Sequence, residues 1–398
     1  MATFAVRFLG CKVSHTDAHA IRERLLRDGH AERSGPADVA VLNTCCVTHE
    51  AVRKSRKAAA RAARMHRRVY VTGCAASLAD AFVGLPENVT VVARPSEQTP
   101  EVVARDVGRI GCVQADARLD RVRAFVKVQD GCSFSCNFCV VPLVRGASRS
   151  RSAQAVLGEV RRRVEQGHRE VVLTGINLGC YRDRTAGYKL PRLVREVGAT
   201  PGLQRLRLSS IEVNHVDAEL VRALEETSTV SRHLHVPLQS GDDRVLRAMG
   251  RRYSAATYLR RLEPLAGFNV TSDVIVGFPG EDEDAFRATL RVVEQAEITK
   301  VHVFPYSPRP GTATAAADTV PPETKKERGA RLRAASQAAC ERRWRAKLGS
   351  VDAVLVDRPG RGYGDDYSPW LVEGPAPVGE LVRARARAVT EAGIVGVC

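Results

Sequence analysis

The sequence has no run of ~18 uncharged apolar residues, the length from which a membrane-spanning helix becomes a candidate. Its opening stretch, MATFAVRFLG, lacks a basic region followed by an apolar core and a cleavage site, so we expect no signal peptide. The chain contains 11 cysteines, and their spacings suit metal ligation better than a disulfide framework. We therefore expect a cytoplasmic protein in a reducing compartment, with no membrane partner.

One basic segment lacks acidic residues altogether. Residues 51–70 hold eight Lys or Arg and no Asp or Glu, and residues 323–348 hold nine against three. The net charge of +16 is therefore concentrated in two stretches that we expect to be helical. Clustered cations favour a phosphate backbone as partner, because each phosphate contact adds to the attraction. A well-solvated surface in an Arg-rich chain is the alternative. The expected RNA contacts in the first stretch are Arg53, Lys54, Arg56, Lys57 and Arg61.

Three cysteines lie close together in Gly131–Cys139, which reads GCSFSCNFC. Cys132, Cys136 and Cys139 have a C-x₃-C-x₂-C spacing. Soft thiolates hold iron–sulfur clusters, and a 4Fe–4S cubane with three protein ligands keeps one iron open for a substrate or cofactor. A zinc site needs a fourth ligand, and no second C-x₂-C or H-x₃₋₅-H follows. A redox C-x-x-C pair would leave Cys132 without a role. The spacing favours the cluster.

A second group of cysteines is spread over residues 1–95. This region alternates apolar strands with helical stretches, which predicts a parallel α/β sheet with helices on its faces. Cys11, Cys45 and Cys74 each lie at or just past the C-terminal end of a predicted strand, in FLGC, LNTC and VTGC. Loops at that edge of a parallel sheet converge on one crevice. Three separate buried structural cysteines are the alternative, but their equivalent positions predict a second cluster.

The remaining chain divides into four segments. Residues 96–120 are irregular and of mixed charge, and we expect an interdomain linker that contains Cys112. Residues 121–320 repeat a strand–helix pattern about six times, which predicts a partial (β/α)₆ barrel with its chemistry at the C-terminal ends of the strands. Residues 321–348 form a basic helical connector. Residues 349–398 alternate short strands and turns, which predicts a small β-barrel.

Small and polar residues follow several of the predicted barrel strands. Small residues let a backbone approach a ligand closely, although a short glycine-containing stretch is weak on its own. The candidate cofactor-binding residues at these ends are Thr174, Gly175, Ser209, Ser210, Glu212, Gln239, Val276 and Gly277. Arg145 follows the cysteine loop and is a further expected RNA contact, through a substrate phosphate. A contact with a carboxylate and the start of a solvated helix are the alternatives. His233 and His235 share one face of a strand and are expected to line the barrel rather than to bind metal.

These motifs resemble those of the radical S-adenosylmethionine (SAM) methylthiotransferase family. The stretches that carry the resemblance are GCKV, NTCCVT, KSR, VTGC, GCSFSCNFC, RGASRSR, LTGINLG, LSSIE, HLHVPLQSG, SDVIVGFPGE and HVFPYSPRPGT. In that family the open iron chelates the amino and carboxylate groups of SAM. One electron from the cluster then cleaves SAM to a 5′-deoxyadenosyl radical. The radical removes an unactivated hydrogen that no general base could take, while the protein positions the cofactor.

The resemblance implies two 4Fe–4S clusters as well as SAM. Cys132, Cys136 and Cys139 match the ligands of the catalytic cluster, and Phe138 in the same loop matches a residue beside SAM. The auxiliary cluster matches Cys11, Cys45 and Cys74. The neighbour of Cys45 is another thiol, Cys46, which leaves open which of the two is the ligand. Residues 349–398 resemble the TRAM domain that ends chains of this family.

The motifs from Thr3 to Gly349 resemble most the branch that acts on N6-threonylcarbamoyladenosine beside the tRNA anticodon. The implied reaction places a methylthio group on carbon 2 of that base, with a second SAM as methyl donor. Three alternatives remain: the branch for N6-isopentenyladenosine tRNA, the branch for a ribosomal-protein aspartate, and a non-catalytic RNA-binding iron–sulfur redox sensor. The expected partners are tRNA and a one-electron reductant such as a flavodoxin or ferredoxin, with no DNA.

Overall fold

The computed structural model describes residues 2–78, 80–93, 98–108 and 122–398. These residues form two compact units, each discontinuous in sequence. The first unit combines the described chain up to residue 108 with Asp130–Ser148 and Ser307–Ala315. The second unit contains residues 122–129, Arg149–Tyr306 and Ala316–Cys398. The cysteine loop Gly131–Cys139 therefore belongs to the same unit as the N-terminal sheet, although it lies within the segment predicted as the barrel.

A five-stranded parallel sheet with the order β2-β1-β3-β4-β5 forms the centre of the first unit. Its strands are β1 (Thr3–Phe8), β2 (Ala31–Glu32), β3 (Val39–Thr44), β4 (Arg68–Gly73) and β5 (Val89–Val91). Strand β3 is buried along its whole length, as expected for a parallel strand covered on both faces. The predicted parallel α/β fold of the N-terminal region is confirmed.

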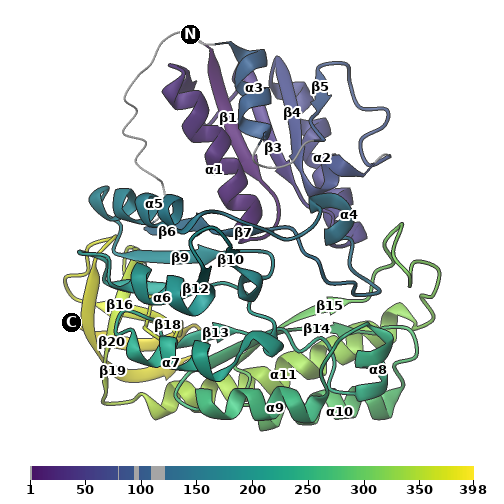
Figure 1. Cartoon of the computed structure of the whole chain (residues 1–398). Coiled ribbons are helices and arrows are strands. Elements are labelled where there is room, and N and C mark those ends of the chain that lie inside the picture. The colour runs from purple at the N-terminus through teal and green to yellow at the C-terminus, as the bar shows by residue number, and fades with distance from the viewer. Residues whose placement is uncertain (1, 79, 94–97, 109–121) are drawn as a thin grey trace. The chain divides into compact units, whose positions relative to one another are not determined.

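Helices cover both faces of this sheet (Figure 1). They are α1 (Lys12–Arg27), α2 (His49–Met65) and α3 (Thr99–Val107). The one-turn helix η1 (Cys74–Ser77), which precedes α3 in the chain, and the short helix α4 (Val141–Arg145) belong to the same unit. Val41 of β3 packs with Ile21 of α1 and Val103 of α3. The next residue, Leu42, points the other way and packs with Ala59 of α2. Alternation along one strand thus sets which helix lies on which face.

Helix α3 lies inside the stretch predicted as a linker. Its Val103 is fully buried in the core of the first unit, and Pro100 occupies its first turn, where a missing N–H is tolerated. The rest of the predicted linker, residues 96, 97 and 109–120 with Cys112 among them, falls outside the described residues.

Six parallel strands of the second unit curve into a partial barrel. They form the sheets β12-β9-β6 and β13-β14-β15, which approach each other through a bridge between Leu206 and Val230. The strands are β6 (Arg123–Lys127), β9 (Glu170–Thr174), β12 (Arg205–Leu208), β13 (His233–His235), β14 (Asn269–Val276) and β15 (Lys300–Pro305). The predicted six-strand barrel is confirmed.

The barrel helices pack on one face of these strands. They are α5 (Ala153–Glu165), α6 (Leu190–Gly198), α7 (Ala218–Glu226), α8 (Asp243–Ala248), α9 (Ala255–Leu262), α10 (Glu283–Gln295) and α11 (Pro322–Ala346). Short elements link them: β7 (Gln129–Asp130), β8 (Arg149–Ser150), β10 (Arg182–Asp183), β11 (Tyr188–Lys189), η2 (Leu178–Cys180), η3 (Val213–His215) and η4 (Glu263–Leu265). Leu234, Val270 and Val301 share one core with Phe286 of α10 and Leu332 of α11. The alternate residues of β13, β14 and β15 therefore face away from the helices.

The chain ends in a closed five-stranded barrel with the order β16-β17-β18-β20-β19, as predicted. Its strands are β16 (Val351–Arg358), β17 (Arg361–Tyr363), β18 (Pro369–Glu373), β19 (Leu381–Thr390) and β20 (Gly393–Val397). Trp370 is almost completely buried in its core. On β19, the three arginines Arg383, Arg385 and Arg387 are exposed, while the alanines between them are buried.

A buried charge network joins the closed barrel to the N-terminal ends of the (β/α) strands. Glu170 of β9 is completely buried and contacts Arg123, Arg205 and Arg207 at 3.1, 3.4 and 2.8 Å. Burial alone would raise the pKa of Glu170, but the three guanidinium groups lower it. Arg207 also donates to the carbonyl oxygens of residues 364 and 365. Backbone oxygens of the loop between β17 and β18 thus supply acceptors for the arginines.

The two adjacent aspartates of that loop, Asp365 and Asp366, both bond to other parts of the second unit. Asp365 accepts a hydrogen bond from the backbone N–H of Arg232 at 3.1 Å. Asp366 is buried and pairs with Arg343 and Lys347 at 2.8 and 3.2 Å. The acidic residues of GYGDDYSPW therefore hold the closed barrel against the rest of the second unit.

Candidate functional site

The loop with Cys132, Cys136 and Cys139 is shaped by glycine and by its own backbone. Gly131 has a φ of 67°, and a side chain there would meet the carbonyl oxygen of Ala147 at 2.2 Å. The N–H of Cys132 donates to the carbonyl of residue 146, and that of Cys139 to the carbonyl of Cys136, both at 3.1 Å. All three cysteines are half-buried and free of disulfides. The loop thus presents three thiols from one short stretch, a donor set that fits iron–sulfur ligation.

A second segment of the first unit supports this loop. The N–H and the hydroxyl of Thr314 both donate to the carbonyl of Asn137, each at 3.1 Å. Phe138, the candidate residue beside a cofactor, is half-buried between this anchored asparagine and Cys139. Ser307–Ala315 therefore helps to fix the conformation of the cysteine loop.

The structure brings Cys11, Cys45 and Cys74 to one edge of the parallel sheet. Cys11 caps the start of α1, Cys45 follows β3, and Cys74 follows β4 as the first residue of η1. A side chain at Gly10 would lie 3.1 Å from Cβ of Cys45, so the loops after β1 and β3 touch. Burial raises the pKa of the Cys45 thiol to about 11, and the nearby Cys74 and Cys11 add to this shift. These three cysteines are therefore close enough to interact, and their thiols fit a second cluster.

Cys46, the alternative ligand to Cys45, is the more deeply buried of the two and is 1% exposed. Interaction with the Cys74 thiol and burial raise the pKa of the Cys46 thiol. Its carbonyl accepts from Arg309 at 3.0 Å. The interaction with Cys46 and the charge of Arg145 lower the pKa of the Cys74 thiol despite burial. Cys46 thus lies in the buried core with Cys74, whereas Cys45 is the more accessible thiol of the pair.

Arg145, at the end of α4, corrects one expectation from the sequence. We expected an exposed contact to RNA, but its side chain is 6% exposed. Its Nε donates to Sγ of Cys74 at 2.9 Å, and the two terminal nitrogens contact Asp17 at 3.0 Å and Asp130 at 2.9 Å. Such a buried guanidinium neutralises buried carboxylates and a thiolate. Arg145 therefore connects the segment that carries the cysteine loop with the sheet edge that carries Cys74.

The candidate cofactor residues of the second unit lie at the C-terminal ends of the strands, and several have their polar groups engaged. The N–H of Gly175 donates to the hydroxyl of Ser209 at 3.1 Å, and Thr174 donates to the carbonyl of Val172. Ser210, next to Ser209, is half-buried. A side chain at Gly175 would meet Oε1 of Gln129 at 2.9 Å. The hydroxyls of Thr174 and Ser209 and the N–H of Gly175 are thus bonded within this strand end before any ligand binds.

Glu212 belongs to the same group but has partners of its own. It is 6% exposed, accepts from Asn214, and lies 3.5 Å from Arg251. Such a carboxylate is positioned by its neighbours before any ligand arrives.

The other candidate strand ends are those after β13 and β14. Gln239 has a φ of 64°, which is uncommon for a residue other than glycine, and its backbone pairs with that of β14. Gly277 has a φ of 71°, and its N–H donates to Glu281 at 2.8 Å. Val276 is fully buried. A sequence pattern alone could not reveal that Glu281 also pairs with Arg328 at 2.6 Å, because these two residues are far apart in the chain.

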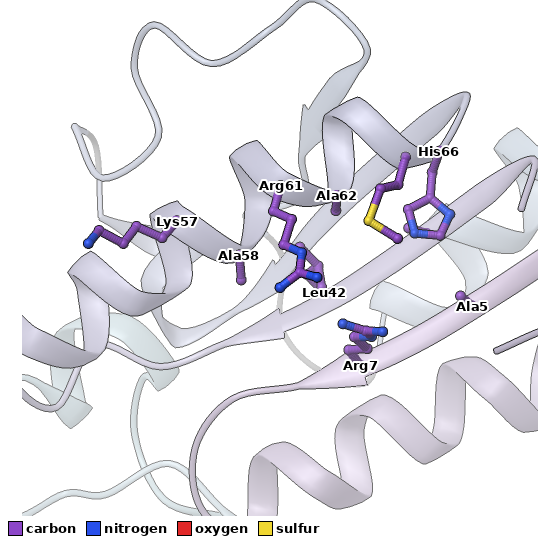
Figure 2. A pocket seen from close by; sticks show the side chains of 10 residues that line it. Ala5, Arg7, Leu42, Lys57, Ala58, Arg61, Ala62 and His66 are labelled. Atoms are coloured by element: carbon purple, nitrogen blue, oxygen red, sulfur yellow. The ribbon is translucent and has the colours of Figure 1, made fainter. Parts of the chain in front are cut away.

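The basic helix α2 divides its cations between two tasks. Arg53 and Lys54 contact Glu50 of the same helix, and Arg56 donates to two carbonyls of the loop after η1. Lys57 and Arg61 instead line a cavity of about 270 Å³ beside β1 and β3 (Figure 2). Arg7 of β1 and His66 are among its other lining residues, and Figure 2 shows Arg7 and Arg61 on facing sides. This cavity combines an alanine-rich floor with a cationic rim.

Comparisons with curated proteins cover between 88% and 99% of this chain. Residues 126–293 match the radical SAM superfamily, and residues 3–92 match an uncharacterized protein family, UPF0004. The threonylcarbamoyladenosine tRNA methylthiotransferase of Bacillus subtilis is 33% identical, over 97% of this chain and 94% of its own length. The tRNA-2-methylthio-N6-dimethylallyladenosine synthase of Alkalilimnicola ehrlichii is 36% identical, over 88% and 86%.

One solved structure shows the same fold at low sequence identity. The radical SAM methyltransferase TsrM from Kitasatospora setae matches 79% of this chain and 77% of its own, with a TM-score of 0.56 and 14% identity. No helix among the described residues is both long and apolar enough to cross a membrane.

Proposed function

The chain belongs to the radical SAM methylthiotransferase family, and we propose that it transfers a methylthio group to carbon 2 of N6-threonylcarbamoyladenosine beside the anticodon of tRNA. The observation that carries this proposal is the presence of two separate groups of three cysteines in the first unit. SAM cleavage alone needs one such group, whereas the second group suits the delivery of sulfur. The relatives from three organisms that act on this base, by their names, support the choice of substrate.

Each cysteine group has its own assigned task in this proposal. Cys132, Cys136 and Cys139 would hold a 4Fe–4S cluster with one iron left for SAM, and this cluster supplies the electron that cleaves the cofactor. The second group, Cys11, Cys45 and Cys74, would hold an auxiliary cluster for the sulfur. Anaerobically reconstituted protein should then contain about eight irons per chain, because each cubane holds four. A content near four would remove the auxiliary site.

The chain's own residues bind and orient the reactants. Gly175, Gln239 and Gly277 would shape the strand ends where SAM would lie. Their N–H groups donate to Ser209, Asp273 and Glu281, so these residues would set the form of the site rather than donate to SAM. The cationic rim formed by Arg7, Lys57 and Arg61 would meet phosphates of the RNA, since its groups line an open cavity. Arg53, Lys54 and Arg56 would add a weaker attraction, because internal contacts already engage them. A cytoplasmic one-electron reductant such as a flavodoxin or ferredoxin completes the proposal.

Mass spectrometry of tRNA nucleosides tests the choice of substrate. A strain without this chain should lose 2-methylthio-N6-threonylcarbamoyladenosine and accumulate its unthiolated precursor, and the natural gene should restore the product. The matched control is the same strain carrying the Cys132→Ala variant, which should not restore it. Loss of the 2-methylthio-isopentenyladenosine product instead would favour the second candidate, which the 36% identity to a dimethylallyladenosine synthase keeps in view. Unchanged nucleosides in the strain would contradict both.

A further inference from the structure

Three side chains from neighbouring strands gather on one face of the sheet β13-β14-β15. In the parallel register, Asp273 of β14 lies opposite His302 of β15, and His235 of β13 lies opposite Thr271. Because alternate residues of a strand share a face, all four side chains project from the same side of the sheet. This is the side that faces away from the helices, since Leu234 and Val301 pack into the helical core.

The polar atoms of this group are close together. Nε2 of His235 lies 3.2 Å from Oδ1 of Asp273, and the rings of His235 and His302 are 5.6 Å apart between centroids. Each of His235, Asp273 and His302 offers a ligand atom, and these three atoms lie within 4.8 Å of one another. Among the residues that the structure describes, no other three His, Cys, Asp or Glu side chains meet this spacing. Solvent reaches the group, because His302 is exposed and the Asp273 side chain is 26% exposed.

The orientation of the His235 ring is fixed by a contact at its other ring nitrogen, Nδ1. Its Nδ1 lies 2.9 Å from the hydroxyl of Thr271, and the same hydroxyl lies 3.1 Å from Nε2 of His233. Histidines that bind metals through one ring nitrogen regularly hydrogen-bond through the other, which fixes the tautomer and the direction of the ring. Thr271 therefore leaves Nε2 of His235 directed towards Asp273.

The distance between these two ligand atoms fits a shared metal ion. With metal–ligand bonds of about 2.1 Å, adjacent ligand atoms in a tetrahedral or octahedral shell lie about 3.0–3.4 Å apart. The observed separation of 3.2 Å falls inside this interval. His302 completes the set from the exposed side, where a rotation of its side chain changes the reach of the imidazole without disturbing the core.

Contrary to the expectation from the sequence that His235 lines the barrel without binding metal, we propose that His235, Asp273 and His302 bind a divalent first-row transition metal ion. Two imidazoles and one carboxylate suit iron(II), manganese(II) or zinc, and the absence of thiolates separates this site from the cysteine groups. Three protein ligands leave further coordination positions open on the exposed side of the sheet. A carboxylate, hydroxyl or phosphate of a bound molecule can occupy them.

Manganese(II) is the probe that tests this site, because thiolates bind it poorly and it should therefore not bind at the cysteines. The reconstituted holoprotein is titrated anaerobically with Mn²⁺, and the free ion is measured by its room-temperature electron paramagnetic resonance signal. The natural chain should bind one Mn²⁺ saturably. Asp273→Asn and His302→Gln should each weaken this binding at least about 10-fold, as expected for loss of a ligand. His302 is exposed, so its variant keeps the fold.

The control variant is Asp284→Asn, which removes an exposed carboxylate from α10 in the same unit and should leave the affinity unchanged. Thr271→Val should lower the affinity by about 10-fold or more without removing a ligand, because it frees the His235 ring. If the natural chain shows no saturable binding, or if both ligand variants retain its affinity, the group is an ordinary histidine–aspartate ion pair and the proposal fails. The readout is metal binding alone, so the result does not depend on which reaction the chain catalyses.

Discussion

The two cysteine groups of the first unit are built in opposite ways. Cys132, Cys136 and Cys139 come from one short loop whose shape depends on local hydrogen bonds and on Gly131. The other group is collected from the ends of three strands and exists only when the sheet β1-β3-β4 has formed. The first is a local property of the chain and the second is a property of its topology. A change in one group should therefore have consequences that the other does not share.

The largest difference between the two cysteine groups is expected from Cys132→Ala. Loss of one of three thiolates removes the local cluster, so formation of 5′-deoxyadenosine from SAM should fall to background. High-performance liquid chromatography of the reduced reaction measures this product. Cys340→Ala, in the helix α11, is the control and should retain cleavage. Cleavage by the Cys132 variant at the natural rate would separate the loop from SAM chemistry.

Cys74→Ala should disrupt only the group that the sheet topology brings together, which consists of Cys11, Cys45 and Cys74. We expect 5′-deoxyadenosine formation to persist while the methylthiolated nucleoside disappears, because the sulfur source is lost. The iron content should drop from about eight to about four per chain. Iron analysis and nucleoside mass spectrometry on one preparation test both points. Methylthiolated product from this variant would show that Cys74 is not a ligand.

Arg145→Met tests a side chain that contacts Cys74 of one group and Asp130, next to the loop that carries the other. Asp17 and Asp130 would remain buried without their cation, which costs about 3–5 kcal/mol when a buried pair is broken. Product formation should fall about 10–100-fold, the usual effect of a partner that orients a metal ligand. Thermal unfolding and turnover are the measurements. Arg145→Lys retains the charge and should recover part of the stability, whereas an unaffected Met variant would contradict the assigned role.

The smallest effect is expected from Cys46→Ser. Cys46 is a buried neighbour of Cys74 rather than a proposed ligand, so the iron content should stay near that of the natural chain, with turnover lowered less than about 10-fold. Cys45→Ser is the matched neighbour and should lose about four irons. Equal iron loss in the two variants would mean that both thiols support the cluster, and the reverse order would make Cys46 the ligand.

The sequence predicted those parts of the fold and site that depend on local pattern. Apolar stretches that alternate with helical stretches predicted the strands of both units, and the position after each strand predicted a common edge for Cys11, Cys45 and Cys74. Arg145 was misplaced because its partners, Asp17 and Cys74, come from segments more than 70 residues away in the chain. The same limit hid the group of His235, Asp273 and His302, since strand register rather than spacing brings it together.

Hydroxyl groups show a second limit of prediction from sequence. Ser209 and Thr174 were candidates for SAM because polar residues at strand ends commonly meet ligands. In the structure, their hydroxyls bond nearby backbone instead. Short polar side chains compete for main-chain partners, and a sequence does not show which partner wins.

The closed barrel at the end of the chain has a further consequence. Its sequence carries more acidic than basic residues, yet Asp366 is buried against Arg343 and Lys347. The three arginines of β19 lie on the outside of the same barrel. One strand therefore presents positive side chains on the outside of a module whose overall charge is negative. The positions of the charged side chains, rather than the net charge of the module, decide what it can attract.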